Sequence, residues 1–502
     1  MRYPALLLSL LLLISAAATS APDEANKVEL EIPEPLISVT DHKGKFNGSS
    51  VSYQVSAGDI YLKDAKGKPK ASIFHVAYTR TNAKDSTSRP LLFVFNGGPG
   101  SSSVWLHMGV FGPKRVVLPS DAERVGAAPF NLADNPLSIL DSADLVFIDP
   151  VGTGYSKPLG SNEGKTFWGV KEDAQAMSEF IRIYITQNNR WNSPKYLVGE
   201  SYGTTRAGAM VRELQEGWGS IDLNGIMLIS SIVDFQTGDF TPGNDLPYVT
   251  FLPTYAATAW YHGKVPDKSK WQTLDAFIKD SRDFALNEYA SVLLKGALAT
   301  TQQVNDVVEK LHSFTGLKKS YIRQTDLRIK EFFFMKELLR DEGKVIGRLD
   351  SRYLGEDADA VSDSMEADPS SYAIDGAYTA ATQYYFANEI NVKRDEPYNI
   401  LSGEVFSNWN WLYGGSARSQ GFLNVTPFIA TGMRQNKDFR VFVANGYYDL
   451  ATPFFATEHS MNHNGIDLNR VTMKYYEAGH MMYIHQPSLE ALVKDIREFL
   501  TQ

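Results

Sequence analysis

Short runs of consecutive apolar residues recur along the chain and predict strands that are buried on both faces of a sheet. They lie at residues 91–95, 145–148, 196–198, 226–229 and 441–443. A strand covered on both faces needs no polar side, so such runs are typical of parallel sheets. Helical spacing alternates with them, for example at residues 171–186 and 205–215. The alternation predicts an α/β domain with a mostly parallel central sheet flanked by helices.

The segment before the first apolar run has a different pattern. Residues 51–62 and 71–79 alternate apolar and polar positions, which predicts antiparallel strands at an edge of the sheet. Residues 63–70 between them are rich in turn formers. Residues 22–50 are polar and mixed, and we expect a loosely held arm there.

The regular alternation stops between residues 236 and 400. This region opens with the turn-forming residues Thr241, Pro242, Gly243 and Asn244, and helical patterns follow at residues such as 255–262, 270–350 and 329–340. We interpret it as a helical cap inserted between two sheet strands. The predicted division is therefore a core at residues 22–235, a cap at 236–400 and a second part of the core at 401–502.

Basic residues gather at positions 318–330 within this cap. Acidic residues interleave with them, so we expect a solvated helix face rather than a nucleic-acid site. The whole chain of 502 residues has a net charge of −9, which repels phosphate backbones. We therefore expect no nucleic-acid partner.

The N-terminal residues match a secretory signal peptide at residues 1–21. Arg2 precedes an apolar run at residues 5–14, which is too short to span a bilayer as a helix. Small residues follow, with Ala16-Ala17-Ala18 as the simplest cleavage site. An uncleaved membrane anchor is the alternative interpretation. No later stretch has the length and apolarity of a membrane span, so we expect no membrane insertion after cleavage.

The sequence contains no cysteine. That excludes disulfides, thiolate metal sites and a cysteine nucleophile. A secreted chain this large can be stabilised by its core alone, and the lack of cysteine favours a bacterial periplasmic or extracellular location. His459 and His463 are four residues apart but lack the glutamate of an H-E-x-x-H motif. We therefore predict neither a metal nor a cofactor.

The strongest chemical signal is Gly199-Glu200-Ser201-Tyr202-Gly203, which matches G-x-S-x-G. An apolar run ends just before it and a helical pattern begins just after it. That strand–turn–helix context is the one that presents a serine nucleophile on a tight turn. Glycines are needed because side chains two residues either side of the serine would collide with neighbouring backbone.

A serine hydroxyl needs a base, and the base needs a carboxylate that orients it. With this motif the expected chain order is serine, acid, histidine. His480 follows the strand-like residues 471–476, and Asp449 follows the apolar run at 441–443. Each alone could be a turn or surface residue. Their joint placement at strand ends, in the required order, predicts a triad of Ser201, Asp449 and His480.

Acyl transfer also needs donors for the developing oxyanion. The backbone N–H of Tyr202 is one candidate, and the glycine-rich loop at residues 96–103 is the second. That loop lacks the Gly-Lys-Ser/Thr ending of a phosphate-binding loop. The pair Gly152 and Gly154 likewise lacks the third glycine of a dinucleotide loop.

Four motifs occur along the chain in an order that resembles the serine carboxypeptidases, peptidase family S10, and in particular a secreted bacterial member. The motifs are Asn96-Gly97-Gly98-Pro99-Gly100, the segment Ile148-Asp149-Pro150-Val151-Gly152-Thr153-Gly154-Tyr155-Ser156, Gly199-Glu200-Ser201-Tyr202-Gly203 and Gly479-His480-Met481. The resemblance extends from about residue 50 to the C-terminus and is weakest in the cap. It implies an α/β-hydrolase fold with a helical cap.

The resemblance also implies residue roles. Ser201, Asp449 and His480 would form the triad, and the amides of Gly98 and Tyr202 the oxyanion hole. The substrate-binding residues would be Asn96, Gly97, Glu200 and Met481. Among them Asn96 and Glu200 would hold the terminal carboxylate of a peptide, which requires one proton shared between the two carboxyl groups. Met481 would lie beside the leaving residue.

Two positions depart from the family pattern. Ser101 stands where a cysteine is usual, and Val110 stands where a second glutamate often shares a proton with the first.

The triad, the oxyanion loop and the resemblance together predict a serine-type carboxypeptidase that hydrolyses peptides through an acyl-enzyme. An esterase or acyltransferase with the same triad is the alternative. A binding protein that has kept the fold and lost catalysis is the third hypothesis.

Overall fold

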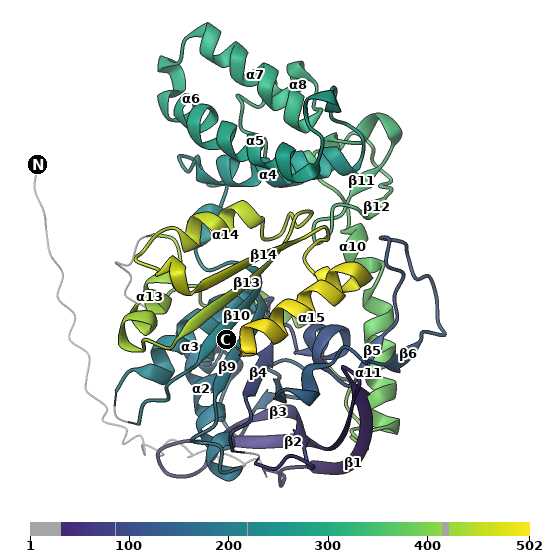
Figure 1. Cartoon of the computed structure of the whole chain (residues 1–502), viewed down its shortest axis with the longest axis vertical. Helices are drawn as coiled ribbons and strands as arrows, with labels where there is room; N and C mark the ends of the chain where they lie inside the picture. The colour runs from purple at the N-terminus through teal and green to yellow at the C-terminus, as the bar shows by residue number, and fades with distance from the viewer. Residues whose placement is uncertain (1–31, 86, 218, 414–420, 502) are drawn as a thin grey trace, which may run out of the picture.

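A mixed sheet forms the centre of the computed structural model, which describes residues 32–85, 87–217, 219–413 and 421–501. Within those residues, ten strands form the sheet in the order β1-β2-β3-β7-β4-β9-β10-β13-β14, with β8 paired to β3 (Figure 1). The strands are β1 (Ile37–Phe46), β2 (Ser49–Lys63), β3 (Pro69–Arg80), β4 (Leu91–Phe95), β7 (Asp144–Ile148), β8 (Lys157–Pro158), β9 (Lys195–Ser201), β10 (Gly225–Ser231), β13 (Arg440–Gly446) and β14 (Val471–Tyr476). The predicted signal peptide at residues 1–21 lies outside the described residues.

The continuous apolar runs form the parallel part of this sheet. Strands β7, β4, β9, β10, β13 and β14 pair in parallel, while β1, β2, β3 and β7 pair antiparallel. All five residues of β4 are buried and alternate between two cores, with Leu92 and Val94 on one face and Phe93 and Phe95 on the other. The predicted fold class, a mostly parallel sheet buried on both faces, is confirmed.

Helices cover both faces of the sheet. The core on one face includes residues of α2, α3 and α13, and the core on the other includes residues of α1, α11 and α15. The helices outside the cap, several of them short, are α1 (Val104–Leu106), α2 (Val170–Gln187), α3 (Tyr202–Gln215), α10 (Pro369–Tyr372), α11 (Asp375–Asn388), α12 (Gly403–Ser407), α13 (Thr426–Gln435), α14 (Phe454–Met461) and α15 (Gln486–Thr501).

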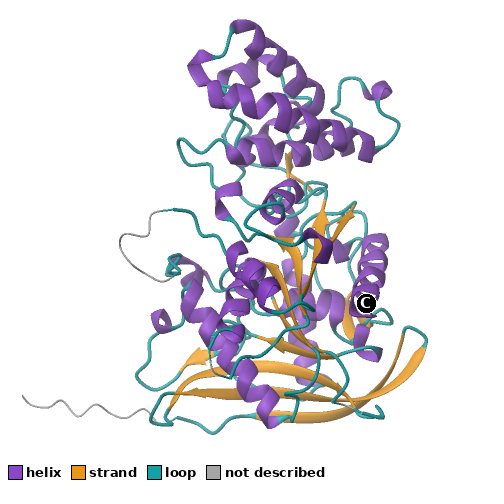
Figure 2. Cartoon of the chain, turned by 60° about the vertical axis from the view of Figure 1, so that its left-hand side comes forward, coloured by secondary structure: helices purple, strands orange, loops and turns teal. Residues whose placement is uncertain are grey.

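A helical cap lies above one end of the sheet (Figures 1 and 2). Its own core includes Tyr448 and Leu450 from the loop after β13, so the cap packs directly on that end of the strands. Its helices are α4 (Leu246–Tyr261), α5 (Leu274–Phe284), α6 (Ala290–Lys295), α7 (Thr301–Thr315), α8 (Lys319–Gln324) and α9 (Glu331–Glu337). Small two-stranded sheets pair β5 (Lys114–Val116) with β6 (Leu132–Asp134) and β11 (Val345–Ile346) with β12 (Leu354–Gly355).

The boundaries of the cap differ from the simplest division of the sequence. Tyr378, Tyr385 and Phe386 of α11 pack in the core of the sheet, not in the core of the cap. The division at residues 236 and 400 remains a prediction, and this packing favours an earlier return to the core. The helical spacing of α11 does not distinguish the two surfaces, because either would bury its apolar face.

The expectation of a loose arm at residues 22–50 is wrong for residues 37–46. These residues form β1, an edge strand that pairs antiparallel with β2 along its whole length (Figure 1). Its side chains alternate between exposed and half-buried, and only Phe46 is buried. Backbone pairing to β2 rather than apolar burial therefore holds this strand, which is why its hydrophobic pattern is faint.

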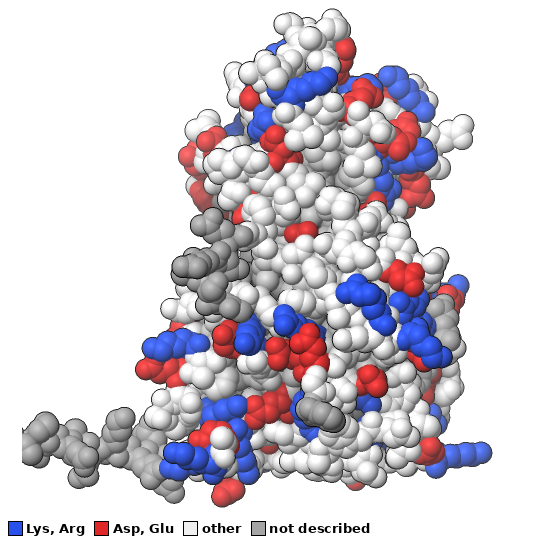
Figure 3. Space-filling model, turned by 90° about the vertical axis from the view of Figure 1, so that its left-hand side faces the viewer, with Lys and Arg blue, Asp and Glu red and all other residues white. Residues whose placement is uncertain are grey.

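The basic stretch of the cap is ion-paired. Lys318 pairs with Asp341, Lys319 with Glu309, and Arg328 with Asp245. On the face drawn in Figure 3, both signs of charge are interspersed over the cap and the lower part of the molecule, with a largely uncharged band between them. In the described part of the chain, no helix combines the length and the apolarity that crossing a membrane requires.

Two buried histidines make the fold sensitive to acid. His75 packs edge-to-face against the rings of Phe180 and Tyr184, and burial lowers its pKa to about 4. His107 stacks on Phe147, and burial lowers its pKa to about 3. Both rings are therefore neutral in the fold, whereas an unfolded histidine binds a proton near pH 6.5.

We expect the free energy of unfolding to fall as the pH drops from about 6.5 towards 4, because the unfolded chain binds the extra protons. Each histidine contributes up to about 1.4 kcal/mol per pH unit in that window. Urea titrations at several pH values measure the slope, and His75→Phe should reduce it. Phe180→Leu, which alters the packing around His75 and removes no titrating group, is the control and should leave the slope unchanged. An unchanged slope in His75→Phe would contradict the burial argument.

Candidate active site

Ser201 lies on a tight turn between β9 and α3. Its backbone has φ 60° and ψ −131°, a conformation that costs free energy and is found at functional sites. The flanking glycines make the turn possible: a Cβ on Gly199 would lie 2.2 Å from the carbonyl oxygen of Gly203, and one on Gly203 would lie 2.9 Å from that of Asn96. The turn therefore projects the serine from the end of a buried strand.

His480 and Asp449 meet at the ends of β14 and β13. The Nδ1 atom of His480 lies 2.8 Å from Oδ2 of Asp449, and both side chains are buried. The other carboxylate oxygen accepts the backbone N–H groups of Ala451 and Thr452 at 2.8 and 2.9 Å. The hydroxyl of Thr452 also donates to Oδ2 at 2.6 Å. The carboxylate is thus held in one orientation against the imidazole.

The backbone of His480 is fixed from two sides. Its N–H donates to the carbonyl of Leu349 at 2.6 Å, and its own carbonyl accepts the hydroxyl of Ser230 at 2.6 Å. The neighbouring N–H of Gly479 donates to Asp350 at 3.2 Å. Ser230 belongs to β10, which pairs with β9, whereas Leu349 and Asp350 come from the segment between the cap and α10. The histidine is therefore clamped between the sheet and that segment.

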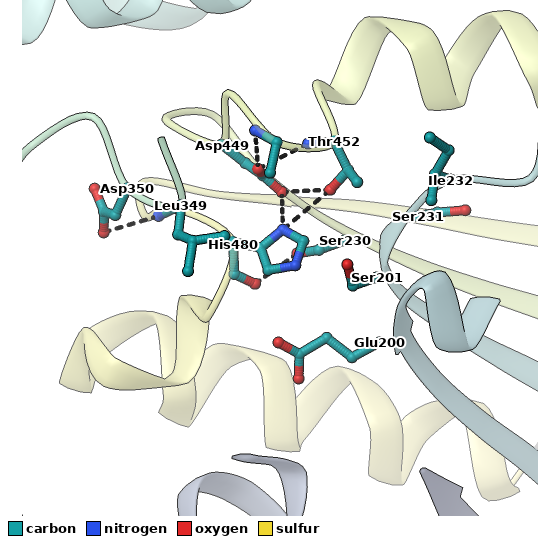
Figure 4. Close-up of polar contacts among 12 residues, drawn as sticks. Glu200, Ser201, Ser230, Ser231, Ile232, Leu349, Asp350, Asp449, Thr452 and His480 are labelled. Atoms are coloured by element: carbon teal, nitrogen blue, oxygen red, sulfur yellow. Dashed lines mark hydrogen bonds and ion pairs between the residues drawn. The ribbon is translucent and has the colours of Figure 1, made fainter. Parts of the chain in front are cut away.

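Ser201 is drawn on the side of the imidazole that faces away from Asp449 (Figure 4). Burial alone would lower the pKa of His480, but the Asp449 carboxylate and its hydrogen bond outweigh burial and raise it above the usual 6.5. The ring is thus a better base than a free histidine. The structure brings the three side chains predicted as a triad to one end of the sheet.

The glycine-rich loop after β4 passes directly over the start of α3. A Cβ on Gly97 would lie 2.5 Å from the backbone nitrogen of Tyr202, so only glycine allows this approach. Gly98 has φ +99°, and its N–H donates no hydrogen bond within the described chain. Tyr202 is the first residue of α3, where helical N–H groups lack a preceding carbonyl. Both amides predicted for the oxyanion hole are therefore available as donors.

The second glycine motif supports this loop. Asp149 accepts the N–H and the hydroxyl of Ser103 at 2.9 and 2.8 Å, and its other oxygen packs against Gly154, where a Cβ would lie 1.8 Å away. Burial raises the pKa of Asp149 to about 6, although its hydrogen bonds from Ser103 and Tyr398 oppose this rise. The motif thus helps to position the glycine-rich loop.

A buried arginine holds the loop from the opposite side. Arg206 of α3 donates to Asp173 at 2.6 Å and to the backbone carbonyl of Asn96. Its guanidinium also lies over the rings of Phe95 and Tyr202, 5.6 and 5.4 Å from their centroids. A charge this deeply buried requires such partners. Arg206 therefore fixes Asn96 relative to the nucleophile turn.

Glu200 is directed into a buried polar cluster. It is only 2% exposed, and its Oε2 accepts Asn96 Nδ2 at 2.9 Å and the hydroxyl of Tyr483 at 2.9 Å. Burial raises the pKa of Glu200 to about 7; the positive charge of His480 and the bonds from Tyr483 and Asn96 act in the opposite direction. At pH values below 7 this carboxyl is therefore mostly neutral.

Met481 follows the histidine and lines a small pocket with Leu349, Tyr353 and Ile374. The predicted role beside the leaving residue remains a prediction. His459 and His463 stack with ring centroids 4.0 Å apart, and His463 Nδ1 lies 2.6 Å from the His459 carbonyl. Across residues 32–413 and 421–501, as far as they are described, no three His, Cys, Asp or Glu side chains gather in a group suited to a metal ion.

The structure adds residues that sequence reasoning missed. Thr452 donates a hydrogen bond to Asp449, and Tyr483 donates one to Glu200. Thr452 lies three residues after Asp449, a spacing at which an aspartate often caps the following turn, so a local signal existed. Tyr483 and the Leu349 carbonyl carry no such signal, because their partners are distant in the sequence.

Comparisons with known proteins agree with this architecture. A family model described as serine carboxypeptidase matches residues 49–495. A solved structure of the prohormone-processing carboxypeptidase KEX1(delta)p from Saccharomyces cerevisiae aligns with 89% of this chain and 91% of its own, at a TM-score of 0.54 and 15% identity. At that identity the likeness shows the fold alone, and it confirms the predicted α/β-hydrolase architecture.

Sequence relatives match over shorter lengths. Serine carboxypeptidase-like 27 of Arabidopsis thaliana is 26% identical over 282 residues, which is 54% of each chain. The pheromone-processing carboxypeptidase KEX1 of Saccharomyces cerevisiae is 33% identical over 165 residues, 32% of this chain and 20% of that protein. The chain thus spans about half the length of the first of these relatives and a fifth of the second.

Proposed function

Because this chain belongs to the serine carboxypeptidase family, we propose that it removes residues from the C-terminal end of peptides through an acyl-enzyme on Ser201. The observation that carries the proposal is the buried pair of His480 and Asp449 at the end of the sheet where the strained turn presents Ser201. An ionised carboxylate only accepts hydrogen bonds, so Asp449 places the proton of the imidazole on Nδ1. The Nε2 atom is then free to take the proton of the serine.

In the first step Ser201 attacks the carbonyl carbon of the last peptide bond while His480 accepts the hydroxyl proton. The negative oxygen of the tetrahedral intermediate would lie between the N–H groups of Gly98 and Tyr202. His480 then donates its proton to the departing amine as the C–N bond breaks. Water, deprotonated by the same histidine, then attacks the acyl-enzyme. As the bond between the acyl carbon and the serine oxygen breaks, His480 returns the proton to Ser201, and the shortened peptide leaves with its new carboxyl group.

Recognition of the chain end is assigned to Asn96, Glu200 and the adjoining Gly97. Two carboxylates would repel each other, so a proton must lie between Glu200 and the terminal carboxyl of the peptide. The pKa of about 7 caused by burial keeps Glu200 protonated in mildly acidic solution. Peptides with a free C-terminus are therefore the proposed substrate class.

We expect a free-acid peptide to be hydrolysed with kcat/KM about 10- to 100-fold above that of its C-terminal amide, the size of one hydrogen bond to a charged group. The amide keeps the same scissile bond and lacks only the charge, which makes it the matched control. Mass spectrometry over time should show a ladder shortening from the C-terminus. Equal rates on both peptides would contradict terminal-carboxylate recognition and favour the esterase or acyltransferase alternative.

The predicted signal peptide at residues 1–21 makes a periplasmic or secreted location part of the same proposal. Substrates would then be peptides outside the cytoplasm. Fractionation of cells that produce the full chain, together with N-terminal sequencing of the mature protein, tests this. A protein retained in the cytoplasm with Met1 intact would contradict it.

A further inference from the structure

The hydroxyl of Tyr483 is the second hydrogen-bond donor to the Glu200 carboxyl. It lies 2.9 Å from Oε2 and 3.2 Å from Oε1, so it spans both oxygens. Asn96 donates to Oε2 as well. In the residues that the structure describes, these two side chains account for the hydrogen bonds of this carboxyl, and no second carboxyl group is among them.

The ring of Tyr483 is locked in this position. The side chain is 1% exposed, and a Cβ on Gly109 would lie 2.5 Å from its ring and 2.7 Å from the hydroxyl of Tyr378. Only a glycine at position 109 leaves room for both aromatic residues. Because the ring has no free space to rotate into, its hydroxyl is held towards Glu200.

Tyr483 also lies on the same segment as the catalytic base. It follows His480 by three residues and belongs to the short 3-10 helix at Met482–Ile484. The segment thus carries both the imidazole next to Ser201 and the phenol on Glu200. The titratable groups whose charge or hydrogen bond acts on the Glu200 carboxyl are His480, Asp449 and Tyr483. Tyr378 of α11 faces it as well.

We propose that Tyr483 is a positioning residue for specificity: its hydroxyl orients the Glu200 carboxyl towards the terminal carboxylate of a peptide and limits that recognition to acidic and neutral pH. This inference rests on the proposed function. A phenol is suited to the role because it donates a hydrogen bond and carries no charge. Burial and the nearby Glu200 charge raise the pKa of Tyr483 well above its ordinary value of 10, so it stays protonated throughout the working range.

The direction of the pH effect follows from this hydrogen bond. A donor to a carboxylate stabilises the ionised form, so Tyr483 lowers the pKa of Glu200 against the effect of burial. Removing the hydroxyl raises that pKa, and Glu200 stays neutral to higher pH. The falling alkaline limb of kcat/KM for free-acid peptides should therefore move upwards. With one titrating carboxyl in the cluster, the limb should correspond to a single proton.

The test is Tyr483→Phe, which keeps the buried ring and removes only the hydroxyl. For free-acid peptides we expect the limb to move up by about 0.5–1 pH unit. We also expect kcat/KM at pH 5.5 to fall about three- to tenfold, mainly through KM, which is the effect of one lost hydrogen bond. The C-terminal amide should show neither change. Tyr385→Phe, which removes another buried hydroxyl bonded to Tyr78, is the matched control and should leave the pH profile unchanged.

An unchanged limb and KM in Tyr483→Phe would overturn the inference. A wild-type enzyme that fails to distinguish free acid from amide would instead refute the proposed function. In that case the hydrogen bond is tested directly by infrared titration of the Glu200 carboxyl. Its band is identified as the one that disappears in Glu200→Gln. An upward shift of that titration in Tyr483→Phe supports the hydrogen bond, and no shift overturns it. Should Tyr483→Phe fold poorly, Gly109→Ala, which displaces the ring, should move the same titration upwards.

Discussion

Replacement of Ser201 by alanine should lower kcat by about 10⁶-fold, because without the hydroxyl there is no acyl-enzyme and only binding and the oxyanion donors act on the substrate. The same variant should lose covalent labelling by a fluorophosphonate probe. The substitution should leave the turn itself unchanged, because its geometry is set by Gly199 and Gly203. Labelling followed by intact mass measures the modification, and a peptide assay measures turnover.

Ser231→Ala is the matched control for this experiment. Ser231 pairs with Ser201 across β10 and β9, is buried, and its hydroxyl has no hydrogen-bond partner among the described residues. It is therefore another serine at the same end of the sheet, without a base beside it. The control should keep both labelling and turnover. Full activity of the Ser201 variant would refute the assignment of the nucleophile.

Replacement of Asp449 by asparagine should lower kcat at neutral pH by about 10⁴-fold while the fold is kept. The amide oxygen can still accept the N–H groups of Ala451 and Thr452. The amide nitrogen would then face Nδ1 of His480 and, as a donor, would favour the tautomer with the proton on Nε2. That tautomer cannot take the proton of Ser201, so the loss arises in the chemical step and not in binding.

The control here is Thr452→Val, which removes the hydroxyl bonded to Asp449 Oδ2 and keeps the carboxylate. We expect its kcat to fall by at most about 100-fold, the effect of one hydrogen bond to a charged group. Steady-state kinetics at pH 7, with circular dichroism to verify the fold, compare the two variants. A loss in Thr452→Val as large as that in Asp449→Asn would mean that the hydroxyl, not the carboxylate, orients the histidine.

The parallel strands could be predicted because burial on both faces requires a continuous run of apolar residues, which is visible in the sequence. Strands β4, β7, β9, β10 and β13 each contain a run of consecutive apolar residues that the fold buries. The edge strand β1 has no such apolar run, because its side chains are exposed or half-buried and its stability depends on pairing with β2. In the same way, the spacing of α11 predicts a helix but not which of two apolar surfaces it covers.

The nucleophile turn was determined by the sequence itself, because its requirements are local. Ser201 needs glycines at 199 and 203, and both lie within two residues of it. Only the tertiary structure decided what surrounds that turn: the Leu349 carbonyl on His480, Arg206 on the Asn96 carbonyl, and Tyr483 on Glu200. The two groups of each pair lie 110 to 283 residues apart in the sequence. Hydrogen bonds between such distant groups impose no periodicity on the chain that could reveal them in advance.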